Sequence, residues 1–210
     1  MFVKSLMKPP HKSLTADVHT SLAHILEILN KEDIQAMPVL DGQRFTGMIS
    51  KEIIYRSFFE NGKDKEDFLL STEAKDIVEK EDYFIHNEEV FERTLPAFKG
   101  FPVLAVVDEH RNFLGLVTRF DVIEQFESAF GIRKKGIRIA FTSEESVGRI
   151  ERLGDIIRNY HENVISLATF DETDKLARRI VLKVEKNNNI EQFTKKLEKT
   201  GFRILSVKEV

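Results

Sequence analysis

A hydroxyl and a carboxylate lie three residues apart at Thr118 and Asp121, directly after an apolar run that ends at Val117. The apolar run over 113–117, which follows a polar turn, predicts a short strand, and a helix is predicted over 119–130. Thr118 then occupies the N-cap of that helix, where backbone N–H groups have no intrahelical partner. These N–H groups and the hydroxyl can bind a phosphate, and the carboxylate of Asp121 can accept hydrogen bonds from ribose hydroxyls.

The same pair also fits a purely structural interpretation. Thr-x-x-Asp approximates a capping box, in which each side chain accepts a hydrogen bond from the backbone N–H of the other residue. In that case the pair stabilises the start of the helix and binds no ligand. The local sequence leaves both interpretations open, and a second occurrence of the pattern in the chain favours the binding site.

The strand, turn, strand and helix around Thr118 have a counterpart about 68 residues earlier. The first copy contains Pro38-Val39-Leu40-Asp41 and Gly47-Met48-Ile49-Ser50, and the second contains Ala105-Val106-Val107-Asp108 and Gly115-Leu116-Val117-Thr118. The openings of the two copies, residues 3–7 and 74–78, are also alike. Internal self-similarity is stronger support than any single motif, because each copy tests the other.

Two copies of this length, each ending in a strand, Gly-x-x-Thr/Ser and a helix, resemble a tandem pair of CBS domains, the Bateman module. The resemblance covers residues 1–130 and implies CBS domains over residues 1–60 and 72–130, packed about a pseudo-twofold axis. It also implies up to two clefts that bind adenosyl ligands such as AMP, ATP or S-adenosylmethionine. The opening segment of each copy would line the cleft of the other copy.

The resemblance places the family's ribose-binding carboxylate at Asp121 and its hydroxyl at Thr118. In the first copy Ser50 fits the pattern, but Ile53 stands at the position of the carboxylate, so we expect that cleft to be degenerate. In the second copy Pro96 interrupts the expected middle helix, because proline has no backbone N–H. The nucleotide-binding residues that the resemblance implies are Ser13, Leu14, Asp17, Val18, Val103, Leu116, Thr118, Arg119 and Asp121.

A new domain is predicted over residues 136–210, after two glycines that bracket a basic trio at 133–135. Apolar periods of two and about 3.6 then alternate in the order β-α-β-β-α-β, the ferredoxin-like split unit. We expect Asn189 to cap the last helix and Gly201 to end it. The predicted fold class is therefore α/β (α+β), a CBS-domain pair followed by a ferredoxin-like domain.

The C-terminal segment also resembles an ACT domain, through Glu145-x-x-Gly148-x-Ile150-x-x-Leu153 and Asn163-Val164. That resemblance implies an amino-acid-binding site at the strand–helix junction, with Val147, Gly148 and Asn163, and a close backbone approach at Gly148. A dimerisation platform is the alternative, since open sheets pair edge to edge. The combination of domains resembles the AcuB-like proteins associated with acetoin utilisation.

Composition limits the remaining function classes. The chain has 210 residues, 41% of them hydrophobic, a net charge of −3 and no cysteine. We expect a cytoplasmic protein with no disulfide and no nucleic-acid footprint. An apolar run long enough to span a membrane is absent, and Met1 to Val3 leads into polar residues unlike a signal peptide.

The histidines and carboxylates show no spacing typical of a metal site or a catalytic constellation. We therefore predict a non-enzymatic regulatory sensor with no catalytic cofactor and no metal, in which an adenine nucleotide is the regulatory ligand. We expect a homodimer that binds a small molecule and neither nucleic acid nor membrane. The alternative is a structural homodimerisation or interaction module with vestigial clefts.

Overall fold

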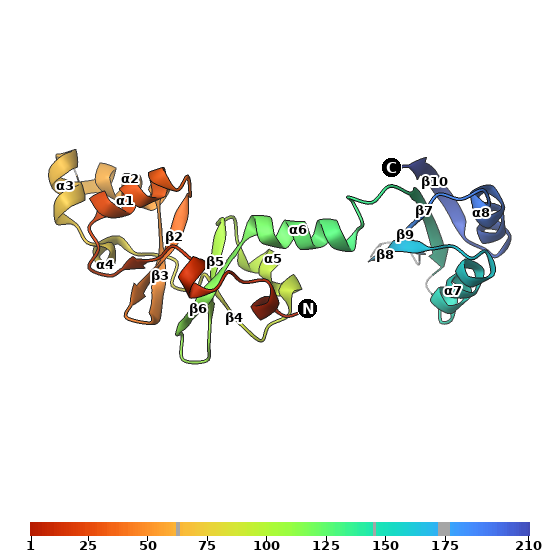
Figure 1. The fold of residues 1–210 in the computed structure, drawn as a ribbon, viewed down its shortest axis with the longest axis horizontal. Helices are drawn as coiled ribbons and strands as arrows, with labels where there is room; N and C mark the ends of the chain where they lie inside the picture. Colours follow the sequence, from red (N-terminus) through yellow and green to blue (C-terminus); the bar gives the residue numbers. More distant parts are fainter. Residues whose placement is uncertain (62–63, 145, 172–176) are drawn as a thin grey trace. The chain divides into compact units, whose positions relative to one another are not determined.

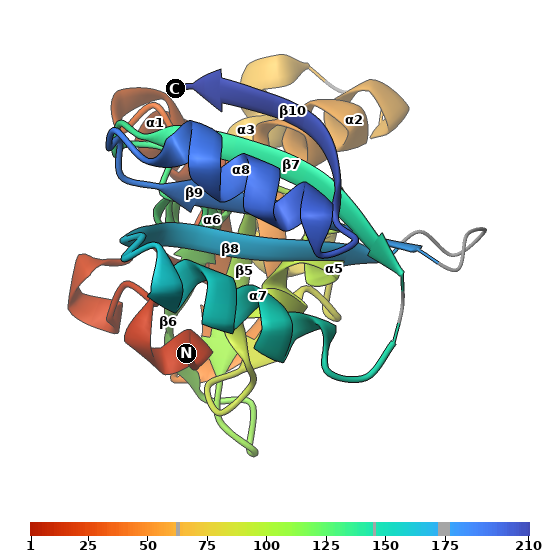
Figure 2. The ribbon, with the colours of Figure 1, turned by 90° about the vertical axis from the view of Figure 1, so that its right-hand side faces the viewer.

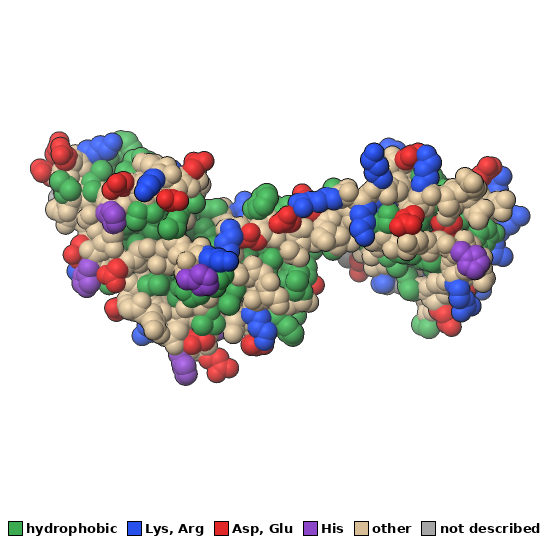
Figure 3. All heavy atoms as spheres, in the orientation of Figure 1, with side chains coloured by type: hydrophobic (Ala, Val, Ile, Leu, Met, Phe, Trp, Pro, Cys, Tyr) green, Lys and Arg blue, Asp and Glu red, His purple; other side chains and the backbone are tan. Residues whose placement is uncertain are grey.

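The computed structural model (Figure 1) describes residues 1–61, 64–144, 146–171 and 177–210. The chain divides into two compact units, Met1–Ile123 and Glu124–Val210, called here the first and second unit. On the face that Figure 3 shows, acidic and basic side chains are interspersed over each unit.

The first unit contains the two copies, except that the last helix of the second copy continues into the second unit. The first copy consists of η1 (Val3–Ser5), η2 (Pro10–Lys12), β1 (Ala16–Asp17), α1 (Leu22–Lys31), β2 (Ala36–Asp41), β3 (Arg44–Ser50) and α2 (Lys51–Asn61). The second has α3 (Lys65–Ser71), α4 (Ala74–Ile77), β4 (Phe84–His86), η3 (Phe91–Arg93), α5 (Thr94–Ala97), β5 (Val103–Val107), β6 (Phe113–Thr118) and α6 (Arg119–Ala129). The predicted strands and helices around both glycine motifs are confirmed.

Each copy has a three-stranded sheet with the same pairing. In the orders β1-β2-β3 and β4-β5-β6, the first pair is parallel and the second pair antiparallel. The register shifts once in each hairpin, between Val39 and Leu40 and between Val106 and Val107. The repeat in the sequence is therefore a repeat of backbone structure, including its irregularity.

The copies differ in their middle helix. In the first copy α1 has 10 residues and buries Leu22, Ile25, Leu26 and Leu29, which face the core at helical spacing. In the second copy α5 has only four residues, and Pro96 lies within it. The predicted interruption is confirmed, since a proline that supplies no N–H limits the helix.

The opening segment of each copy pairs with the last strand of the other copy. The backbone N–H of Lys8 donates to the carbonyl of Leu116 (2.8 Å), and the N–H of Leu116 donates back to Lys8 (3.0 Å). Glu79 and Met48 form the equivalent pair (2.6 and 3.1 Å). The crossed arrangement gives the first unit its pseudo-twofold organisation.

The repeated glycines make these crossings possible. A Cβ atom at Gly115 would overlap the carbonyl oxygen of Lys8, and one at Gly47 would lie 2.5 Å from the carbonyl oxygen of Glu79. Any side chain at either position would force the strands apart. The glycine of the Gly-x-x-Thr/Ser motif is therefore a packing requirement.

The second unit contains β7 (Ile137–Glu144), α7 (Arg149–Asn159), β8 (Val164–Asp171), β9 (Ala177–Val184), α8 (Ile190–Lys199) and β10 (Arg203–Glu209). The sheet order is β10-β7-β9-β8, and all neighbours are antiparallel. Figure 2 shows α7 and α8 on one face of this sheet. The predicted βαββαβ order is confirmed.

Two local predictions in this unit were wrong. The Asn189 side chain makes no cap hydrogen bond, and the side chain of Asn187 instead accepts from the N–H of Asn189 (2.8 Å). Gly148 has no neighbour within 4 Å of a built Cβ, so it permits no close approach. It is needed for its positive φ of 84° at the start of α7, which disfavours residues with a side chain.

Candidate functional site

A cavity of about 450 Å³ lies in the first unit, where the opening segment of the first copy crosses the second copy. This size is within the range of small-molecule sites. Its lining contains the apolar residues Leu14, Ile34, Ala36, Pro102, Val103, Leu116 and Phe120, and the polar residues Lys8, Lys12, Gln35, Thr118 and Arg119. The cavity therefore combines an apolar wall with three cationic side chains.

Backbone contacts of the opening segment position the two lysines. The pairing with Leu116 fixes Lys8 against β6, and the turn of η2 carries Lys12. The hydroxyl of Ser13 donates to the carbonyls of Pro9 (2.9 Å) and Lys8 (3.1 Å) and so closes this turn. Ser13 acts here through the backbone and does not line the cavity.

Thr118 and Asp121 form the capping box. The N–H of Thr118 donates to Oδ2 of Asp121 (3.0 Å), and the N–H of Asp121 donates to Oγ1 of Thr118 (3.2 Å). The Thr118 hydroxyl also donates to Oδ2 of Asp121 (2.5 Å). Nζ of Lys8 lies 3.6 Å from Oδ1 of Asp121, so both carboxylate oxygens face groups of the protein.

Three backbone donors at this helix start are engaged within the protein. Besides the N–H groups of Thr118 and Asp121, the N–H of Arg119 donates to the carbonyl of Pro102 (3.0 Å). The side chains of Lys8, Lys12 and Arg119 offer cationic groups to a phosphate in the cavity. The guanidinium of Arg119 donates to the carbonyl of Phe101 (2.9 Å) and lies over the ring of Phe98 (5.9 Å).

The structure brings five of the nine implied nucleotide-binding residues to the cavity: Leu14, Val103, Leu116, Thr118 and Arg119. Asp17 instead accepts from the N–H of His19 (2.9 Å), and Val18 packs against the core of the first copy. Asp121 lies behind Thr118 in the capping box. Sequence reasoning missed Lys8, Lys12, Ile34, Gln35, Ala36, Pro102 and Phe120, because the chain crossing that unites them is tertiary.

The equivalent position in the first copy has different chemistry. Ser50 caps α2 by accepting from the N–H of Ile53 (3.1 Å), and Ile53 is buried. Glu79 occupies the position of Lys8, and its carboxylate pairs with Arg56 (2.5 Å). This pair raises the pKa of the Arg56 guanidinium. The two ion pairs between an opening segment and a helix, Lys8 with Asp121 and Glu79 with Arg56, thus have opposite charge order.

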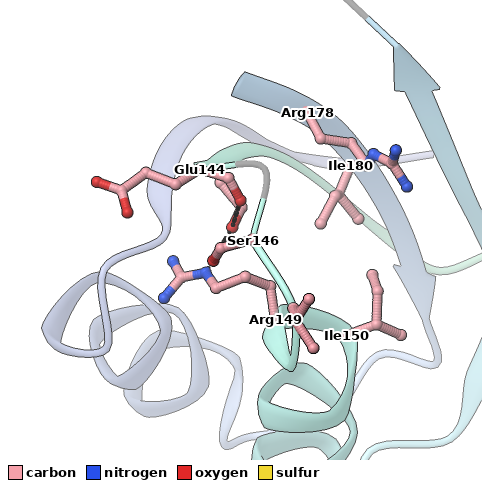
Figure 4. Close-up of a pocket in the computed structure, with 8 residues that line it drawn as sticks. Glu144, Ser146, Arg149, Ile150, Arg178 and Ile180 are labelled. Atoms are coloured by element: carbon pink, nitrogen blue, oxygen red, sulfur yellow. Dashed lines mark hydrogen bonds between the residues drawn. The ribbon is translucent and has the colours of Figure 1, made fainter. Parts of the chain in front are cut away.

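A second cavity, of about 350 Å³, lies in the second unit at the start of α7 (Figure 4). Ile150 of α7 and Ile180 of β9 point toward one another there. Of the residues expected to bind an amino acid, Val147 lines this cavity, whereas Gly148 and Asn163 do not. The full lining is Ser143, Glu144, Ser146, Val147, Arg149, Ile150, Arg178 and Ile180.

Arg149 connects the start of α7 to β7 and to the turn that follows α8. Its Nε donates to the Ser143 hydroxyl (2.7 Å), and its Nη2 donates to the carbonyl of Gly201 (2.7 Å). The guanidinium also lies 4.5 Å from the ring centre of Phe202. These contacts give Arg149 a structural role beside the second cavity.

Within the described ranges, three or more histidine, aspartate or glutamate side chains do not gather where they could hold a metal ion. In the same part of the chain, none of the helices is long and apolar enough to cross a membrane.

Comparison with known proteins identifies the first part of the chain. Residues 3–60 match the family model of the CBS domain. A CBS domain-containing protein from Bacillus anthracis is 24% identical and has a TM-score of 0.55, over 60% of this chain and 93% of that one. The structure of CBSX2 in complex with AMP is 19% identical, with a TM-score of 0.53, over 63% of this chain and 98% of that one. Residues 3–60 thus match a CBS domain, and about 60% of the chain shares the fold of solved CBS-domain structures.

A curated relative is the A-adding tRNA nucleotidyltransferase of Geobacter sulfurreducens, 28% identical over 117 residues. The match includes 52% of this chain and spans only 12% of that enzyme.

Proposed function

We propose that this chain is a non-enzymatic regulatory sensor that binds an adenine nucleotide in the cavity of the first unit. The observation that carries the proposal is the cavity itself, an apolar slot lined by Lys8, Lys12 and Arg119 beside a helix start. An adenine ring is flat and largely apolar, whereas a phosphate needs cationic or N–H donors. The AMP complex of CBSX2, which has the same fold, supports this ligand class.

The adenine would contact Val103 and Leu116 on the β5–β6 hairpin and Leu14 on the opening segment. The phosphate would meet the lysines. Asp121 would accept from the ribose hydroxyls through Oδ1, the oxygen that now faces Lys8 at 3.6 Å. In this role, the ammonium group of Lys8 leaves Oδ1 of Asp121 and binds the ligand. Oδ2 of Asp121 keeps its hydrogen bonds to Thr118 in the capping box.

We propose that α6 transmits occupancy of the cavity to the second unit. Its first turn follows Thr118, and the two residues directly after its end, Phe130 and Gly131, are held by the second unit's sheet. The Ser166 hydroxyl donates to the carbonyl of Phe130 (3.0 Å), and the buried ammonium of Lys183 donates to the carbonyl of Gly131 (2.9 Å). Coupling between two sites is typically about 1–3 kcal/mol. An ACT-like role for residues 136–210 and an AcuB-like pathway remain part of this proposal.

Isothermal titration and thermal unfolding with adenine nucleotides test the proposal. A ligand at about 100 times its dissociation constant adds about 2.7 kcal/mol of stability. Leu14 lines the cavity and is 40% exposed, so Leu14→Glu should block binding without unfolding the protein. Leu70 is an exposed leucine outside the cavity lining, and Leu70→Glu is the matched control that should bind normally.

One observation favours a second candidate function, a structural interaction module with vestigial clefts. The capping box already occupies Thr118 and Oδ2 of Asp121, as a helix start without a ligand requires. Under this alternative, adenine nucleotides would leave the melting curve unchanged, and the protein would act through a homodimer or a partner surface. An unresponsive melting curve across AMP, ADP, ATP and S-adenosylmethionine would therefore overturn the sensor proposal.

A further inference from the structure

Three cationic side chains, Lys8, Lys12 and Arg119, line the cavity of the first unit. Among the described residues of this lining none is acidic. The nearest carboxylate partner that the structure gives these cations is Asp121, which lies 3.6 Å from Lys8 and is engaged by Thr118. The cavity therefore has more positive than negative charge available to a ligand.

Three backbone N–H groups at the start of α6 are already occupied. The N–H groups of Thr118, Arg119 and Asp121 all donate within the protein, so the helix start offers them to no phosphate. The flexible side chains of Lys8 and Lys12 can match negative charge on a ligand. Ammonium groups bind phosphate as mobile point charges and can follow a chain of several phosphates.

We infer that the cavity selects nucleotides with two or more phosphates over a nucleoside, a monophosphate or S-adenosylmethionine. This inference rests on the proposed function and names the ligand class of the same site. S-adenosylmethionine has a sulfonium and an ammonium against one carboxylate, so its net charge is positive and the three cations repel it. Each added phosphate brings negative charge to Lys8 and Lys12 without a new apolar contact.

The pseudo-equivalent position of the first copy supports this selection by charge. Glu79 replaces Lys8 there, and Ile53 replaces Asp121. A polyphosphate at that helix start would meet the carboxylate of Glu79, which pairs with Arg56, instead of an ammonium group. The chain should therefore bind one nucleoside polyphosphate per molecule.

The test is a calorimetric titration of the full chain with adenosine, AMP, ADP, ATP, S-adenosylmethionine and inorganic triphosphate, in magnesium-free buffer at low and high salt. ATP should bind at least about tenfold tighter than AMP, because the added phosphates accept charge-assisted hydrogen bonds from the ammonium groups. This advantage should shrink at high salt, because partly exposed charges are screened. We expect one site per chain.

The variant Lys12→Gln should remove most of the difference between ATP and AMP and leave adenosine binding unchanged. Lys65→Gln is the control, because Lys65 is an exposed lysine on α3 outside the cavity lining. Equal affinities for adenosine, AMP and ATP, or tighter binding of S-adenosylmethionine, would overturn the inference and leave the proposed function intact. If triphosphate alone binds as tightly as ATP, or if none of the adenine compounds binds, the proposed function itself fails.

Discussion

The substitution Asp121→Ala separates the two roles that one carboxylate can have in this protein. In the structure Oδ2 of Asp121 accepts from the N–H and the hydroxyl of Thr118, at 3.0 and 2.5 Å. Its side chain is 17% exposed, so water can replace these contacts only in part. Loss of a cap costs about 0.5–2 kcal/mol. We expect Asp121→Ala to lower the free energy of unfolding by roughly 1–2 kcal/mol.

Asp121→Asn keeps an acceptor oxygen and removes the charge, and it should cost roughly 0.3–1 kcal/mol, the interaction of a charge with the helix dipole. Glu52→Ala is a suitable control, because Glu52 is an exposed acid in the first turn of α2. Urea denaturation followed by circular dichroism measures all three variants. If Asp121→Ala were as stable as the wild type, the capping box would not hold the start of α6.

Titration of the same variants with nucleotide decides the second role. If Asp121 binds ribose, Asp121→Ala should weaken binding by about 1.5–3 kcal/mol, the contribution of hydrogen bonds to a charged group. If Asp121 is only a cap and a partner of Lys8, affinity should stay the same or rise, because Lys8 is released toward the phosphates. Unchanged or tighter binding together with lost stability would refute the ribose assignment.

Gly115→Ala should cost more than about 1 kcal/mol of unfolding free energy, because its Cβ would overlap the Lys8 carbonyl at a φ of 153°. By contrast, Gly154→Ala in the exposed part of α7 meets no neighbour and should stabilise by about 0.5–1 kcal/mol in the same urea experiment. Lys183→Met removes the hydrogen bond to the carbonyl of Gly131, so the neighbouring segment should open locally more often and trypsin should cleave the basic trio at 133–135 several times faster. An unchanged cleavage rate would contradict this role of Lys183. Burial raises the pKa of Glu162 above its ordinary 4.5, so the folded state binds this proton more tightly and stability should fall as pH rises through that window. Glu162→Gln should remove this pH dependence, which urea titrations at pH 4 to 7 would detect.

Much of the fold is determined locally and was therefore predictable. The alternation in Ile137, Ile139 and Phe141 places these side chains on the helix-covered face of the second unit's sheet, where all three are buried. The spacing of Leu22, Ile25 and Leu29 likewise fixes the buried face of α1. The period of the apolar residues shows which side of a helix or strand faces the core, and a few consecutive residues are enough to reveal it.

The sequence alone also determined that the chain repeats itself and that Thr118 and Asp121 stand at the start of a helix. It could not determine which groups share the cavity, because Lys8 and Thr118 are more than 100 residues apart and meet only through the crossed opening segment. Nor could it show that the Asp121 carboxylate faces Thr118 instead of the cavity, since the same sequence is compatible with either orientation of this side chain. Local order follows from neighbours along the chain, whereas the shape and charge of the cavity follow from distant segments, which only tertiary packing brings together.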